Sequence, residues 1–136
     1  MVVRLVVGVF IVLHGLVHLL YAGQSQRIFE LQPGMVWPDG SWAFSRMLGD
    51  ARARSLAAVF LALAAVGFVA GGIGVLAGQR WWRPFVVASA AFSAAIFCLF
   101  WDGGWQNLDD KGAFALLINA VILAAVLVFQ WPDVGS

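Results

Sequence analysis

Four long apolar runs separated by three polar connections make up most of this sequence. The runs cover about residues 2–22, 53–78, 84–101 and 112–131, and the few charged residues within them lie close to their ends. A helix needs about 20 residues to cross a hydrocarbon core of roughly 30 Å, and each run comes close to that length. The pattern predicts an all-α fold with four transmembrane helices.

The first connection, residues 23–52, is much longer than the other two. It contains two turn signals, Pro33-Gly34 and Pro38-Asp39-Gly40, and continues with apolar residues set among charged ones. The apolar residues are Trp42, Phe44, Met47 and Leu48. This pattern predicts a short amphipathic helix lying at the membrane interface. An ordered loop anchored by its aromatic rings is the alternative.

The second and third connections, residues 79–83 and 102–111, are short. Short connections join antiparallel neighbours, so the simplest topology is an up-down-up-down bundle. Indole rings favour the head-group region of a bilayer, and tryptophans stand at the ends of the runs. They are Trp81, Trp82, Trp101, Trp105 and Trp131. We therefore expect residues 1–136 to form one domain, located in the cell membrane as a multi-pass protein.

Composition agrees with a lipid environment. Hydrophobic residues make up 62% of the chain and charged residues 11%, whereas a soluble domain carries about 25% charged residues. The lipid bilayer is therefore the first predicted partner. The formal net charge of +1 argues against nucleic acid as a partner. The single cysteine, Cys98, excludes an internal disulfide and any CxxC motif.

The second run is rich in glycine at helical spacing. Gly67 and Gly71 form one GxxxG pair, and Gly74 and Gly78 form another. Such pairs let two helix backbones approach closely. The simpler interpretation is packing against the small residues of the third run, from Ala88 to Ala95. A homodimer through the four glycines is the alternative.

Polar residues within the runs are few, and they are costly in lipid unless they have a role. His14 and His18 are one turn apart, so they share a helix face, with Tyr21 in phase one turn later. Asn119 lies about 10 Å into the fourth run, and Asp102 ends the third. All five fall in the same half of the bundle. They predict a polar, ligand-binding cavity that opens toward the long connection.

Several ligands suit such a cavity. An HxxxH pair is half of a transition-metal site, so His14 and His18 are candidate metal ligands, which Asp102 or Cys98 could complete. A haem with one axial histidine, or held between two protomers, and a quinone-like molecule are further alternatives. In the remaining alternative the histidines only form hydrogen bonds between helices. Hydrolase, metalloprotease and phosphate-loop motifs are absent, which leaves enzymatic activity open.

The first run also contains a spaced set of residues that is typical of one family of membrane proteins, namely Arg4, Gly8, His14-Gly15 and His18. It resembles the first helix of the DoxX-like family of small four-helix membrane proteins, in which Lys often stands where this chain has His18. The resemblance covers about the first 25 residues, and the rest of the chain departs from the family pattern. Some members are subunits of quinone-linked oxidoreductases, including thiosulfate:quinone oxidoreductase. The resemblance thus implies a membrane oxidoreductase as partner.

Two functions follow as hypotheses. The first is a small accessory or ligand-binding membrane subunit, redox-linked, that binds a quinone-like ligand, haem or metal near His14 and His18. The second is a structural or interaction protein whose intramembrane polar residues only hold the helices together.

Overall fold

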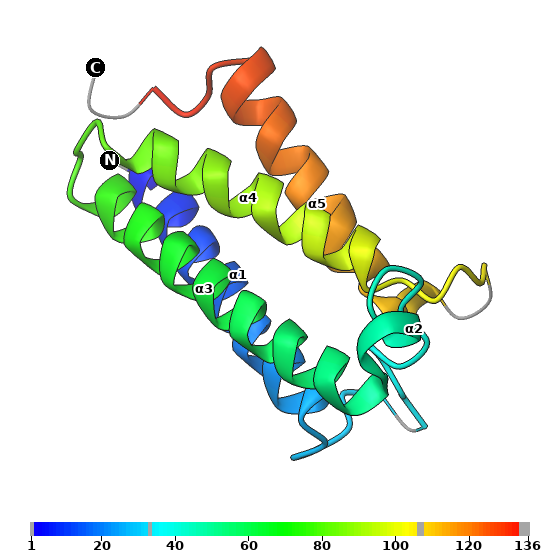
Figure 1. Cartoon of the computed structure of the whole chain (residues 1–136). Helices are drawn as coiled ribbons and strands as arrows, with labels where there is room; N and C mark the ends of the chain where they lie inside the picture. The colour runs from blue at the N-terminus through cyan, green and yellow to red at the C-terminus, as the bar shows by residue number, and fades with distance from the viewer. Residues whose placement is uncertain (1, 33, 106–107, 134–136) are drawn as a thin grey trace.

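The computed structural model describes residues 2–32, 34–105 and 108–133, and every regular element within those ranges is helical (Figure 1). The elements are α1 (Val2–Ser25), α2 (Ser45–Leu48), α3 (Asp50–Leu76), α4 (Trp82–Leu99), η1 (Leu108–Lys111), α5 (Ala113–Leu123) and η2 (Ala124–Val128). η1 is a 3₁₀ turn, and η2 is a π-helical continuation of α5. The all-α prediction is therefore confirmed, and the short helix expected in the first connection is present as α2, a single turn.

Three of the helices, α1, α3 and α4, are long and apolar enough to cross a membrane. α5 and η2 together make a shorter apolar helix, Ala113–Val128. The sequence predicts a fourth helix extending to about residue 131, so the observed helix ends earlier. Gln130 adopts a left-handed backbone conformation with φ of 52°, and Pro132 follows it. Neither residue can continue a helix, although the apolar run itself goes on to Trp131.

α1 packs along α3 through glycine on both helices (Figure 1). A Cβ atom added to Gly15 would lie 2.8 Å from Phe68 Cβ, and one added to Gly72 would lie 2.9 Å from the backbone nitrogen of Val12. Both distances are shorter than real Cβ contacts, so a larger residue would force the helices apart. The first and second apolar runs therefore meet backbone to backbone.

α3 packs along α4 in the same way. At Gly67 an added Cβ would overlap the Ser89 hydroxyl oxygen. It would lie 2.6 Å from a methyl of Val86 at Gly71 and 2.8 Å from Trp82 Cβ at Gly74. A single chain therefore already uses three of the four GxxxG glycines to bring α3 and α4 together. Gly78 instead follows the end of α3, with φ of 67°. The homodimer through these glycines stays a prediction.

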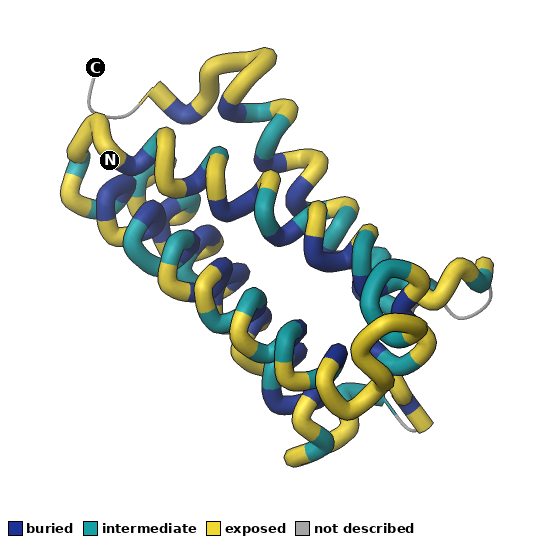
Figure 2. The backbone as a smooth tube through the Cα atoms, viewed as in Figure 1, coloured by how far each residue is buried: buried dark blue, intermediate teal, exposed yellow. Residues whose placement is uncertain are grey.

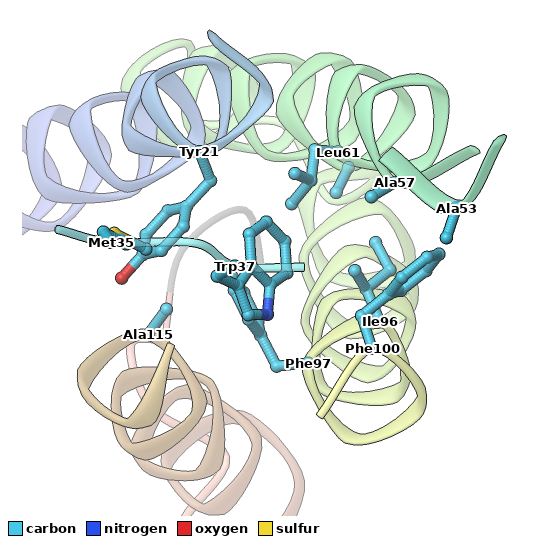
Figure 3. Close-up of a cluster of buried hydrophobic side chains, with 11 residues drawn as sticks. Tyr21, Met35, Trp37, Ala53, Ala57, Leu61, Ile96, Phe97, Phe100 and Ala115 are labelled. Carbon is cyan, nitrogen blue, oxygen red and sulfur yellow. The ribbon is translucent and has the colours of Figure 1, made fainter. Parts of the chain in front are cut away.

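Buried residues lie on the sides of the helices that face one another, and the outward sides are exposed (Figure 2). α4 also packs against α5, so neighbouring helices contact in chain order. The core divides into two clusters. One, centred on Phe68 and Trp82, fills the end near the start of α1. The other, around Tyr21, Trp37 and Phe97, fills the end near the long connection (Figure 3).

The long connection folds back onto the helix ends. Its residues Met35 and Trp37 are buried, with only 2% and 4% of their surfaces exposed. Asp39 ties it to α3, because the carboxylate lies 2.6 Å from Arg54 Nε. The same carboxylate lies 3.0 Å from Nη2 of Arg27, within the connection itself. The connection therefore forms a fixed cap over one end of the helices.

Candidate functional site

Four polar residues meet between three helices, in the interior of the apolar region. His14 and His18 come from α1, Ser93 from α4 and Asn119 from α5. Ser93 and Asn119 are fully buried, and His14 and His18 keep 5% and 1% of their surfaces exposed. We call these four residues the polar cluster. Their burial means that each polar atom depends on a partner within the protein.

Hydrogen bonds link the four residues of the polar cluster in sequence, so that each residue donates to the next. His18 Nδ1 lies 2.8 Å from the backbone carbonyl oxygen of His14, and this oxygen can only accept, so Nδ1 carries a proton and donates. In the neutral ring His18 Nε2 is then an acceptor, and the Ser93 hydroxyl donates to it over 2.6 Å. Asn119 Nδ2 donates to Ser93 Oγ over 2.7 Å. His14 Nε2 donates to Asn119 Oδ1 over 2.9 Å.

The chain of bonds closes on itself. Each of the four residues donates one hydrogen bond and accepts one, and the last donor, His18, returns to the backbone of the first, His14. The arrangement assigns opposite tautomers to the two rings, with the proton on Nε2 of His14 and on Nδ1 of His18. Because both rings are neutral in this scheme, it places no net charge in the apolar interior.

Aromatic side chains enclose the two imidazole rings. Phe68 of α3 lies 4.8 Å from His14 and 5.1 Å from His18, measured between ring centroids. Phe10 stacks parallel to His14 at 6.2 Å, and Phe97 lies 6.2 Å from His18. The polar cluster is therefore surrounded by apolar rings, which raise the cost of any unpaired polar atom inside it.

The structure brings together three of the five residues that the sequence analysis assigned to the cavity, His14, His18 and Asn119. Tyr21 instead packs in the aromatic cluster near the long connection, with its ring edge-on to Trp37 and Phe97 at 5.6 and 5.1 Å. The predicted opening toward the long connection is occupied by Trp37 and Met35 (Figure 3). Access from that side would require this cap to move.

Asp102 lies three residues beyond the end of α4 and outside the polar cluster. Its carboxylate lies 3.1 Å from Lys111 Nζ and accepts the backbone N–H of Gly104 over 2.8 Å. Cys98 is exposed. Ser93 is the cluster member that sequence reasoning missed, because it was counted only as a small residue suited to packing. The sequence signal for Ser93 was its hydroxyl group, which stands halfway along an apolar run.

The polar cluster is a poor metal site as it stands. His18 uses both ring nitrogens and His14 uses Nε2, so His14 Nδ1 is the one imidazole nitrogen of the cluster that keeps a lone pair outside the chain of bonds. Among the described residues, no group of three or more His, Cys, Asp or Glu side chains could hold a metal ion. A transition metal or haem iron would gain a single imidazole ligand unless the hydrogen bonds were broken.

A small apolar crevice of about 250 Å³ lies between α1 and α5. Phe10 and Ile11 line it from α1, and Val121 and Ile122 line it from α5. Because Phe10 stacks on His14, the crevice approaches the polar cluster from the amino-terminal half of α1.

Comparison of the chain with protein-family models finds no match, and comparisons with curated proteins and with solved structures find none either.

Proposed function

We propose that this chain is a small multi-pass protein of the cell membrane, an up-down-up-down bundle in which the polar cluster holds α1, α4 and α5 in one arrangement. It would act as a structural or interaction subunit. The closed chain of hydrogen bonds carries the proposal, because within it each of the two histidines, Ser93 and Asn119 donates one bond and accepts one without any ligand.

The value of such a cluster lies in specificity. A hydrogen bond between helices in a membrane contributes on average about 0.6 kcal/mol, so the three that join different helices add little stability. A rotation of α5 that removed Asn119 from the cluster would leave polar atoms unpaired among Phe10, Phe68 and Phe97. Alternative rotations are therefore penalised, and the outer faces of the bundle keep a fixed relation for a partner to recognise.

The second candidate is a ligand-binding subunit, and the crevice between α1 and α5 favours it. His14 Nδ1 can only accept a hydrogen bond when Nε2 holds the proton. It would therefore bind a ligand with a hydroxyl donor, such as the reduced form of a quinone. The resemblance of residues 4–18 to the DoxX-like family supports a redox link and a membrane oxidoreductase as partner.

Nitrogen-15 NMR of the imidazole rings tests both candidates in reconstituted protein. We expect a protonated Nε2 for His14 and a protonated Nδ1 for His18, because the hydrogen-bond chain requires opposite tautomers. Identical tautomers, or a charged ring, would contradict the structural proposal. A quinol added to the vesicles should shift the His14 Nδ1 signal and leave the His18 signals in place. If no signal moves at saturating quinol, the second candidate is wrong.

A further inference from the structure

A second, larger groove lies on the outside of the helices, between the end of α4 and the start of α5. It encloses about 680 Å³, which is within the usual range for ligand sites of about 300–1,000 Å³. Its apolar walls come from Phe97 and Cys98 on α4 and from Leu116, Leu117 and Ala120 on α5. Leu117 is 63% exposed, so the groove is open on its outer side. It is separate from the polar cluster.

One end of this groove is polar and ringed by indoles. Lys111 lines that end together with Trp42, Trp101 and Trp105. The Trp42 indole N–H donates to the Cys98 carbonyl over 2.7 Å, so the position of its ring is fixed. Because tryptophans favour the head-group region, this end of the groove belongs at the membrane interface.

The groove runs for about two turns along α5. The helix begins at Ala113, and Ala120 is the last residue of the lining, so the apolar wall extends about 10 Å along the helix axis. Half of a hydrocarbon core of roughly 30 Å is about 15 Å. An apolar chain that starts beside Lys111 and lies along α5 would therefore follow the groove through about two thirds of one leaflet.

Lys111 at the polar end is paired with Asp102, which does not line the groove but shares a small neighbouring cavity with Lys111. Lys111 Nζ lies 3.1 Å from Asp102 Oδ1 and 3.3 Å from the Gly104 carbonyl oxygen, and an ammonium group has three N–H donors, so one is left over. The Asp102 side chain is 35% exposed. A head group with a phosphate and an ammonium complements such a pair, with phosphate toward Lys111 and ammonium toward Asp102.

We propose that this groove binds a zwitterionic phospholipid from the surrounding bilayer, with one acyl chain along α5 and its head group at Lys111 and Asp102. Native mass spectrometry of the full chain with added phosphatidylcholine tests it. We expect one retained lipid, lost in Ala120→Phe because the ring fills the groove. Ala124→Phe is the matched control, because this exposed alanine lies one turn beyond the groove, and it should keep the lipid.

The head group and the chain can be tested apart. Lys111→Met keeps the apolar stem but removes the ammonium, so retention of phosphatidylcholine should fall several-fold while retention of diacylglycerol stays unchanged. Cys98 gives a second readout, because it is the only cysteine and lines the groove. Phosphatidylcholine should slow its alkylation by N-ethylmaleimide several-fold in the parent and in Ala124→Phe, and leave it unchanged in Ala120→Phe.

Three results would overturn the proposal. The first is equal lipid retention by Ala120→Phe and the parent. The second is protection of Cys98 by a quinone but not by phosphatidylcholine. The third is a dimer that protects Cys98 without any lipid. None of these results bears on the polar cluster, so this inference and the proposed structural role fail separately.

Discussion

Removing a single oxygen atom, by Ser93→Ala, tests the polar cluster most directly. The Ser93 hydroxyl donates to His18 Nε2 and accepts from Asn119 Nδ2, at 2.6 and 2.7 Å. Its loss removes two hydrogen bonds, together worth about 1 kcal/mol at the average for membrane helices. It also leaves a buried acceptor and a buried donor unpaired, and an orphaned group costs about 1–3 kcal/mol. We therefore expect Ser93→Ala to lower the free energy of unfolding by about 2–3 kcal/mol.

The assay is reversible unfolding of the detergent-solubilised protein with sodium dodecyl sulfate, followed by far-ultraviolet circular dichroism. Ser89→Ala is the matched control, because Ser89 is a buried serine one turn earlier on α4 whose hydroxyl faces Gly67. It should change the free energy of unfolding by less than about 0.5 kcal/mol. Equal effects of the two substitutions would refute the idea that Ser93 joins a hydrogen-bonded cluster.

A double-mutant cycle sharpens the result. Asn119→Leu removes the partner whose N–H group Ser93→Ala would orphan, so the two substitutions together should cost less than the sum of their separate effects. Side chains in one hydrogen-bond network couple by about 0.5–3 kcal/mol. Strict additivity would mean that Ser93 and Asn119 act independently, which contradicts the 2.7 Å bond between them.

Three further predictions concern the packing, the cap and the topology. Gly71→Leu should lower the melting temperature in detergent, because even a Cβ would lie 2.6 Å from Val86. The control Ile73→Leu, at a 51%-exposed position of α3, should leave it unchanged. Equal melting curves would place the glycine face against lipid. Trp37→Ala should lower the free energy of unfolding in SDS by about 3–5 kcal/mol and speed hydrogen exchange near Tyr21. Trp105→Ala, at a 78%-exposed position, is the control. Unchanged exchange would mean that Trp37 does not seal this end. Single cysteines at positions 39 and 102, in a Cys98→Ser background, should react with an impermeant maleimide from one side of sealed vesicles, and a cysteine at position 80 from the other; opposite labelling of positions 39 and 102 would refute the up-down-up-down topology.

The sequence was sufficient to predict the long helices, because apolar length is what the bilayer requires. The end of the fourth helix was not predictable from the same signal. Its apolar residues continue to Trp131, and the left-handed backbone of Gln130 leaves no mark on the hydropathy pattern. The glycine pairs predicted close helix contact, and the contacts of Gly71 and Gly74 with α4 agree with the simpler, intrachain interpretation.

The candidate site was predictable only in part. Helix phase placed His14 and His18 on one face, and helical rise placed Asn119 at a similar depth. Periodicity carries no information on how one helix is rotated against another, so it could not exclude Asp102. The hydroxyl of Ser93 in an apolar run marked this residue as unusual, but the pattern could not show that it faces the histidines. The cap was missed for a different reason. Trp37 stands between turn residues in a polar connection, and its insertion among Tyr21 and Phe97 depends on the tertiary fold.

The unequal lengths of the helices have a consequence for the surrounding bilayer. The first turn of α3 carries Asp50, Arg52 and Arg54, so its apolar part, residues 55–76, extends about 33 Å, whereas the 11 residues of α5 and the 5 of η2 extend about 24 Å. Relative to a hydrocarbon core of roughly 30 Å, α3 is long enough and the helix on the side of α5 is too short. Local thinning of the membrane relieves a deficit of this kind. Lipids beside α5 would then be shortened and strained, and a neighbouring protein with an equally short helix would share that cost, so hydrophobic mismatch alone favours a companion on this side.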